Sequence, residues 1–153
     1  MNFVSYLDEQ GIKYRVSHHD PAYRAQDLAQ AEHVSGKKVI KPVVVRADGQ
    51  WVMCALPASY RVDLDELRQQ LEAQTVQLAE ERALGELFHE CELGAEPPIG
   101  RLWGITTLMD ESLLNDDMVT FQAGTHSDCV TMSLMEYRRI AQPEVAHFGR
   151  PSC

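Results

Sequence analysis

Lys41 lies in the segment VIKPVVV, residues 39–45, whose other members are apolar or proline. The alternation predicts a strand in which Lys41, Val43 and Val45 share one face. Both faces are apolar, which is typical of a strand that is covered on both sides. An ammonium group there has two interpretations. It extends to solvent from the beginning of the strand along its aliphatic stem, or it projects into a pocket and binds a phosphate or a carboxylate.

Two further segments could supply polar groups to such a pocket. GAEPPIG, residues 94–100, holds two glycines and two prolines, so it predicts a stiff loop that can direct backbone groups at a small ligand. AGTHSD, residues 123–128, places His126 in a turn between two expected strands. A plain surface connection and a solvated turn histidine are the structural alternatives, and these residues alone leave them open.

The elements that position these residues follow from hydrophobic periodicity, caps and turn signals. Helices are expected over residues 2–10, 24–34, 63–73, 79–88 and 133–143. Strands are expected over residues 12–19, 38–47, 50–57, 118–124 and 128–134. Asp48-Gly49, between the second and third strands, is a strong hairpin signal.

This mixture of hairpins and helices, without regular βαβ alternation, predicts an α+β fold. We expect a single domain over residues 1–153, with a central mixed or antiparallel β-sheet flanked by helices. The last ten or so residues show no periodic signal and are expected to form a tail.

The composition is that of a globular domain. The chain has 153 residues, 44% of them hydrophobic and 24% charged, which suits one domain with one core. No apolar run of about eighteen residues and no basic-then-apolar leader occurs, so we expect no membrane span, no signal peptide and a cytoplasmic location. The four cysteines are widely spaced, which favours free thiols over a disulfide framework.

The charge distribution limits the partners. A net charge of −9 argues against DNA and against indiscriminate nucleic-acid binding, which needs a large basic surface. Four basic residues nevertheless gather within ten positions, at Lys37, Lys38, Lys41 and Arg46. This basic edge suits contact with a short piece of phosphate backbone, or it is a solvated strand end.

A metal centre and a cysteine nucleophile are the main alternatives for catalysis. Possible metal ligands occur at His18, His19, His89, Cys91 and Glu92. The spacings of the zinc deaminases and of His-Glu-x-x-His hydrolases are absent, however. Cys54 and Cys129 lie in apolar strands, where a thiol behaves as a small hydrophobic group. We therefore expect no metal and no cofactor.

Lys41 in its apolar strand, the loop of residues 94–100 and Gly124-Thr125-His126 together resemble the YbaK/prolyl-tRNA-synthetase-associated domain family in order and spacing. His18 in YRVSHHDP and the ending VTMSLMEYRRIA also fit the family layout. The similarity spans residues 1–143. The resemblance implies a YbaK-like fold and a metal-independent hydrolase that cleaves, in trans, the ester of a tRNA mischarged with a small amino acid such as alanine, serine or cysteine. It also implies two partners, the 3′ end of the aminoacylated tRNA and an aminoacyl-tRNA synthetase.

The same resemblance implies roles for individual residues. Lys41 would hold the 3′-terminal backbone or the aminoacyl group, and the loop from Gly94 to Pro98 would position the carbonyl or the attacking water through backbone groups. The implied catalytic residues are thus Lys41, Gly94 and Pro98. The implied substrate-binding residues are His126, Gly100, Gly124, Lys38 and His18. Among these, His126 would line the amino-acid pocket and set its size and polarity.

Pro42 departs from the family pattern, in which a small polar residue such as threonine follows the lysine. Proline removes a side-chain hydroxyl and a backbone N–H donor beside the expected site. A second hypothesis therefore stays open, a non-catalytic tRNA- or nucleotide-binding module of the same fold. An editing hydrolase releases the amino acid from mischarged tRNA, whereas a binding module leaves the ester intact.

Overall fold

The computed structural model describes residues 3–18 and 38–152, so the helix expected over residues 24–34 lies outside the described residues. Within these ranges the strands are β1 (Tyr14–His18), β2 (Ile40–Ala47), β3 (Gln50–Pro57), β4 (Tyr60–Val62), β5 (Val76–Leu78), β6 (Thr106–Asp110), β7 (Met118–Gln122), β8 (Asp128–Ser133), β9 (Glu144–Ala146) and β10 (Gly149–Pro151). The helices are α1 (Phe3–Glu9), α3 (Leu64–Leu71), α4 (Glu81–Leu87) and α5 (Leu134–Ala141), with 3₁₀ helices η1 (Gly100–Trp103) and η2 (Glu111–Asn115). None of these helices is long and apolar enough to cross a membrane.

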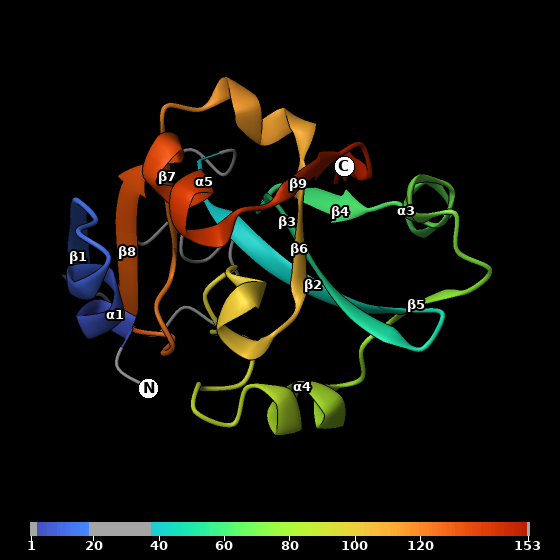
Figure 1. Cartoon of the computed structure of the whole chain (residues 1–153), viewed down its shortest axis with the longest axis horizontal. Coiled ribbons are helices and arrows are strands. Elements are labelled where there is room, and N and C mark those ends of the chain that lie inside the picture. Colours follow the sequence, from blue (N-terminus) through green and yellow to red (C-terminus); the bar gives the residue numbers. More distant parts are fainter. Residues whose placement is uncertain (1–2, 19–37, 153) are drawn as a thin grey trace.

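The described strands form three sheets, which confirms the α+β fold with a mixed central sheet (Figure 1). The five-stranded sheet has the order β5-β2-β3-β6-β9, the three-stranded sheet the order β1-β8-β7, and β10 pairs with β4. Pairing is antiparallel between β2 and β3 but parallel between β3 and β6. Because a parallel neighbour requires a long crossover, the chain passes through α3, β5, α4 and the loop of residues 94–100 before it returns as β6.

The β2–β3 hairpin forms as its turn residues predict. Asp48 and Gly49 have φ angles of 48° and 85°, the left-handed conformation that a two-residue hairpin turn of this type requires. The Asp48 carboxylate accepts hydrogen bonds from the backbone N–H groups of Gln74 (3.0 Å) and Thr75 (2.9 Å). These bonds fix the hairpin tip beside β5, which pairs with residues 45–47 of β2.

The alternation along β2 places its side chains in different parts of the core. Ile40 packs in a hydrophobic cluster with Phe121 and Tyr137. Val45 packs in another cluster with Leu67. Ile40 and Val45 are both almost fully buried, so β2 is covered on both faces, as its sequence predicts.

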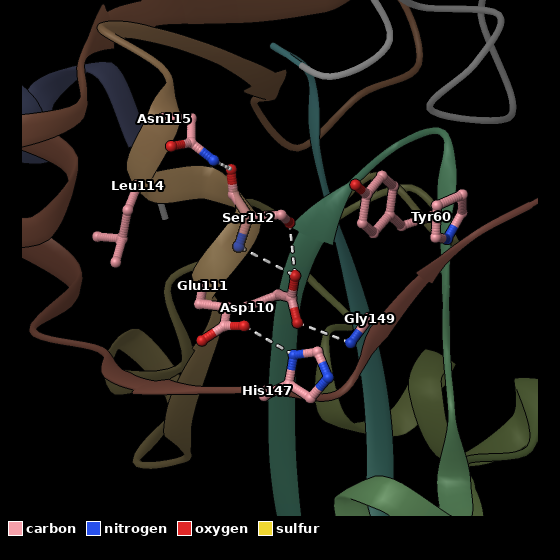
Figure 2. Close-up of a pocket in the computed structure, with 9 residues that line it drawn as sticks. Tyr60, Asp110, Glu111, Ser112, Leu114, Asn115, His147 and Gly149 are labelled. Carbon is pink, nitrogen blue, oxygen red and sulfur yellow. Dashed lines mark hydrogen bonds and ion pairs between the residues drawn. The ribbon is translucent and has the colours of Figure 1, made fainter.

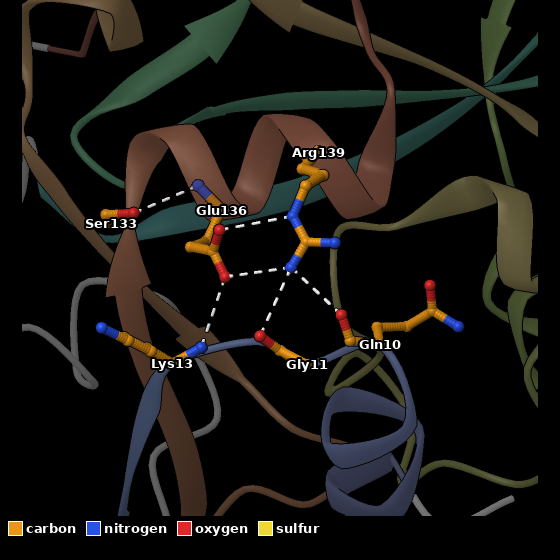
Figure 3. Close-up of polar contacts among 6 residues, drawn as sticks. All are labelled: Gln10, Gly11, Lys13, Ser133, Glu136 and Arg139. Carbon is orange, nitrogen blue, oxygen red and sulfur yellow. Dashed lines mark hydrogen bonds and ion pairs between the residues drawn. The ribbon is translucent and has the colours of Figure 1, made fainter.

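Helix α5 holds the N-terminal segment in place (Figure 3). Its Arg139 donates from Nη2 to the carbonyl oxygens of Gln10 (3.1 Å) and Gly11 (3.4 Å). Its Glu136 accepts a hydrogen bond from the backbone N–H of Lys13 (3.3 Å) and also pairs with Arg139. The connection between α1 and β1 is thereby fixed against α5, more than 120 residues further along the chain.

The expected C-terminal tail is instead part of the sheets. Strand β9 extends the five-stranded sheet in parallel with β6, and β10 pairs antiparallel with β4. The prediction of a tail was wrong here because a strand of three residues is too short to show a period of two. The pairing partners, far away in sequence, determine its conformation.

Asp110, at the end of β6, ties this C-terminal segment to the sheet (Figure 2). Its carboxylate is 1% exposed. Oδ1 accepts hydrogen bonds from the backbone N–H groups of Phe148 (3.0 Å) and Gly149 (2.6 Å). Oδ2 accepts from the backbone N–H (3.2 Å) and the hydroxyl (2.5 Å) of Ser112. A cavity of about 520 Å³ adjoins these residues, but the buried Asp110 carboxylate already accepts four hydrogen bonds from the protein.

We expect Asp110→Ala to lower the free energy of unfolding by about 3 kcal/mol, because several backbone donors would lose their acceptor at a buried site. Urea denaturation measures the change. Glu111→Ala is the matched control, since neighbouring Glu111 makes an exposed ion pair with His147 (2.9 Å), a contact that contributes less than about 1 kcal/mol. Equal losses in the two variants would contradict the role of Asp110.

Candidate active site

The loop of residues 94–100 and the turn of residues 123–128 lie directly against each other. The backbone N–H of Glu92 donates to the Gly124 carbonyl oxygen (2.8 Å), and the Gly124 N–H donates to the Ala95 carbonyl oxygen (2.8 Å). The Glu92 carboxylate accepts a hydrogen bond from the His126 backbone N–H (2.6 Å). Two segments that are about thirty residues apart in the sequence therefore form one polar unit.

His126 is built into this unit. Its side chain is buried, and Nε2 lies 2.7 Å from the Leu93 carbonyl oxygen. Because a carbonyl oxygen can only accept, Nε2 carries a proton in this contact. The ring also faces Gly94, where a Cβ would lie 3.9 Å from His126 Cε1. The structure thus brings Gly94, Gly124 and His126 together.

The second half of the loop is anchored in the core. Residues 95–100 are all buried. The Tyr137 hydroxyl donates to the Pro98 carbonyl oxygen (2.6 Å), and the Gly100 N–H donates to Thr107 Oγ1 (2.8 Å). A Cβ on Gly100 would clash with the Ile105 carbonyl oxygen, so only glycine fits there. Pro98 and Gly100 fix the position of the loop.

Lys41 is the second residue of β2, opposite Leu56 of β3. Its side chain is half-buried, and this burial lowers the pKa of its ammonium group, because desolvation disfavours the charged form. Among the residues that the structure describes, it has no ion-pair or hydrogen-bond partner. No hydrogen bond or ion pair joins its side chain to Gly94, Gly124 or His126, all of them described residues.

The two residues just before β2 nevertheless run alongside β7, the strand that leads to that unit. The Thr120 N–H of β7 donates to the Lys38 carbonyl oxygen (2.9 Å), and Val39 forms a parallel bridge with Thr120. From this bridge the two segments run in the same direction. Lys41 follows two residues after Val39, and Gly124 follows four residues after Thr120. The Lys38 side chain is exposed.

His18 lies on the outside of the turn. It ends β1 and pairs in register with Asp128 of β8, and its imidazole contacts the Asp128 carboxylate. The same carboxylate accepts a hydrogen bond from the Thr125 hydroxyl (2.6 Å). His18 thus supports the turn that carries His126, while its own side chain is 79% exposed.

Glu96 is a residue of this region that the sequence-based prediction missed. Its side chain is 3% exposed, and burial raises its pKa to about 7. A glutamate inside the otherwise apolar loop GAEPPIG is the sequence signal that could have identified it, since carboxylates are rarely buried without a specific role.

The cysteine thiols are poorly suited to nucleophilic catalysis. Cys54 and Cys129 are buried, as expected. Burial raises the pKa of Cys54 to about 12 and that of half-buried Cys91 to about 11, so the reactive thiolate is scarce at neutral pH. No three His, Cys, Asp or Glu side chains within residues 3–18 and 38–152 are grouped as metal ligands; His19 lies outside these ranges.

Comparisons with known proteins agree on one relationship. The model of the aminoacyl-tRNA editing domain matches residues 19–140. The chain is also similar to the multifunctional Ser/Thr-tRNA deacylase ProXp-y of Escherichia coli (strain K12), with 26% identity over 152 residues that cover 96% of this chain and 90% of the relative.

Two solved structures have the same fold. One is the hypothetical protein APE2540, with a TM-score of 0.87 and 20% identity over 98% of this chain and 100% of that one. The other is a protein put forward as a trans-editing enzyme for prolyl tRNA synthetase, with a TM-score of 0.83 and 20% identity over 95% of this chain and 93% of that one.

Proposed function

Because the chain belongs to the aminoacyl-tRNA editing domain family, we propose that it is a hydrolase that releases a small amino acid from the 3′ end of a mischarged tRNA, acting in trans. Serine and threonine are the first candidates, since the curated relative is named for them, and alanine and cysteine follow. The proposed partners are the 3′ end of the aminoacylated tRNA and an aminoacyl-tRNA synthetase.

The half-buried ammonium group of Lys41 is the observation that carries this proposal. A desolvated cation without a carboxylate partner among the described residues is stabilised by any anion that reaches it. The terminal phosphates of a tRNA supply such an anion. A single-stranded 3′ end needs only a few cations for binding, so the net charge of −9 is compatible with this substrate.

The loop and the turn are proposed to position the ester. The hydrogen bonds that join Gly124 and His126 to residues 92–95 hold this backbone before any substrate binds. Preorganised groups of this kind supply much of the acceleration in acyl transfer. Pro98 and Gly100 contribute by anchoring the loop through Tyr137 and Thr107. Buried His126 would line the amino-acid pocket, where one methylene changes binding by about 1–3 kcal/mol.

A deacylation assay tests the function. tRNAs charged separately with serine, threonine, alanine and cysteine are incubated with the protein, and the released amino acid is measured against spontaneous hydrolysis. We expect catalytic release from at least one of them. Binding of the charged tRNA without any release would contradict hydrolysis and favour the binding module, in which Pro42 replaces the polar residue of the family. A prolyl-tRNA synthetase added to the assay tests the second partner.

A further inference from the structure

Glu96 carries a buried carboxyl group with one oxygen that accepts no hydrogen bond from the described residues. Among the described residues, Glu96 Oε2 has no hydrogen-bond partner. Burial is the main cause of its raised pKa, and a hydrogen bond from its own backbone N–H and the charge of His126 act in the opposite direction. A buried acceptor without a donor is costly, so a ligand that brings a donor to this oxygen gains affinity.

The position of Glu96 is fixed by the unit that holds His126. The carbonyl oxygen of the preceding residue, Ala95, accepts the Gly124 N–H (2.8 Å), and the carbonyl oxygen two residues later, at Pro98, accepts the Tyr137 hydroxyl (2.6 Å). Because the backbone is held on both sides of Glu96, the position from which its side chain extends is fixed. The charge of His126 acts on this carboxyl group, whose own charge raises the pKa of Cys91. The hydrogen bond from the Gly124 N–H to the Ala95 carbonyl oxygen places Glu96 next to the turn that carries His126.

The charges of the substrate match those of the protein. An aminoacyl-tRNA 3′ end presents phosphates and one α-ammonium group. The protein offers the ammonium of Lys41 to the phosphates and a carboxyl oxygen of Glu96 that still lacks a donor. We propose that the Glu96 carboxylate binds the α-ammonium group of the aminoacyl ester; this inference rests on the proposed function. The substrate class is then an ester with a free α-amino group, and N-acylated esters such as peptidyl-tRNA are excluded.

The chemistry favours an ammonium group over the hydroxyl of a substrate side chain. A cation next to a buried carboxyl group stabilises its ionised form. The hydrogen bond between two opposite charges is about twice as strong as one between neutral groups. A hydroxyl group gives neither advantage.

Binding to two non-hydrolysable analogues tests the inference. The probes are 3′-deoxy-3′-(L-serylamino)adenosine and its N-acetyl derivative, which differ in the ammonium group, and their affinities are measured by calorimetry at pH 7. We expect the wild type to prefer the free amine by a factor on the order of ten to a hundred, as for a hydrogen bond to a charged group. Glu96→Gln should remove this preference. Glu86→Gln, which neutralises an exposed carboxylate on α4, should retain it.

Three outcomes would overturn the inference. These are equal wild-type affinities for the two analogues, no measurable wild-type binding of either one, and a preference for the free amine that persists in Glu96→Gln. The first two use only the wild type, so they do not depend on the folding of a variant. Deacylation of Ser-tRNA and Thr-tRNA by the same preparations reports separately on the proposed function, which can hold while the role of Glu96 fails.

Discussion

Lys41→Met is expected to reduce kcat/KM for deacylation by about a hundredfold or more while the fold is retained. The ammonium group is half-buried and has no ion-pair partner among the described residues, so its removal breaks no interaction within them. It would, however, deprive the substrate of a preorganised charge in a partly desolvated site, where one such group typically accounts for a factor of about 10² to 10³. Initial rates at several substrate concentrations give the measurement.

Lys13→Met is the matched control. Lys13 is an exposed lysine just before β1, and its hydrogen bond to Glu136 of α5 comes from its backbone N–H. It should leave deacylation unchanged. If Lys41→Met retains wild-type activity, Lys41 has no role in the reaction. If both variants lose activity equally, general charge attraction rather than a specific site explains the effect.

The stability of Lys41→Met should change with pH in a defined direction. Burial lowers the pKa of Lys41 in the folded protein below the ordinary value of 10.5, so protonated Lys41 is disfavoured by folding. Between the folded and unfolded pKa values the unfolded chain binds more protons, and wild-type stability therefore rises with pH in that window relative to the variant. Denaturation at pH 7 and at pH values approaching 10.5 should show Lys41→Met at least as stable as the wild type at pH 7, with the difference shrinking at high pH.

Gly94→Val is the second change for which we expect a large effect, loss of nearly all activity with a small loss of stability. Gly94 has a φ of 81°, which a β-branched residue adopts only with strain. Its missing side chain faces His126, 3.9 Å from Cε1. Valine would thus strain the loop backbone at φ 81° and place its γ-methyl groups beside the His126 ring, while the anchors at Pro98 and Gly100 stay in the core. Deacylation rates and urea denaturation together measure the two effects.

Gly11→Val provides the control for backbone strain alone. Gly11 has a φ of 67°, and nothing lies within 4 Å of a Cβ placed on it. It should cost similar stability but leave deacylation intact. A fully active Gly94→Val would remove the loop from the mechanism, and equal activity losses in both variants would indicate a general effect of strain.

Local chemistry in the sequence was sufficient for several elements. Asp48-Gly49 predicted the β2–β3 hairpin because aspartate and glycine are among the residues that adopt the left-handed conformation of this turn. The helix expected from residue 63 forms as α3, and the Asp63 carboxylate at its start accepts the Glu66 N–H (3.0 Å). The turn that carries His126 was likewise predicted from its own residues. In each case the sequence signal comes from residues within a few positions of one another.

The tertiary structure decided what depends on distant segments. The order of the sheets, the parallel pairing of β6, and strands β9 and β10 follow from partners far away in sequence. The same holds for the contact of residues 92–95 with Gly124 and His126, and for the burial of Glu96. The sequence determined which polar groups this protein has; packing alone decided which of them are desolvated and adjacent, because burial and hydrogen bonding between remote segments leave no periodic signal in the chain.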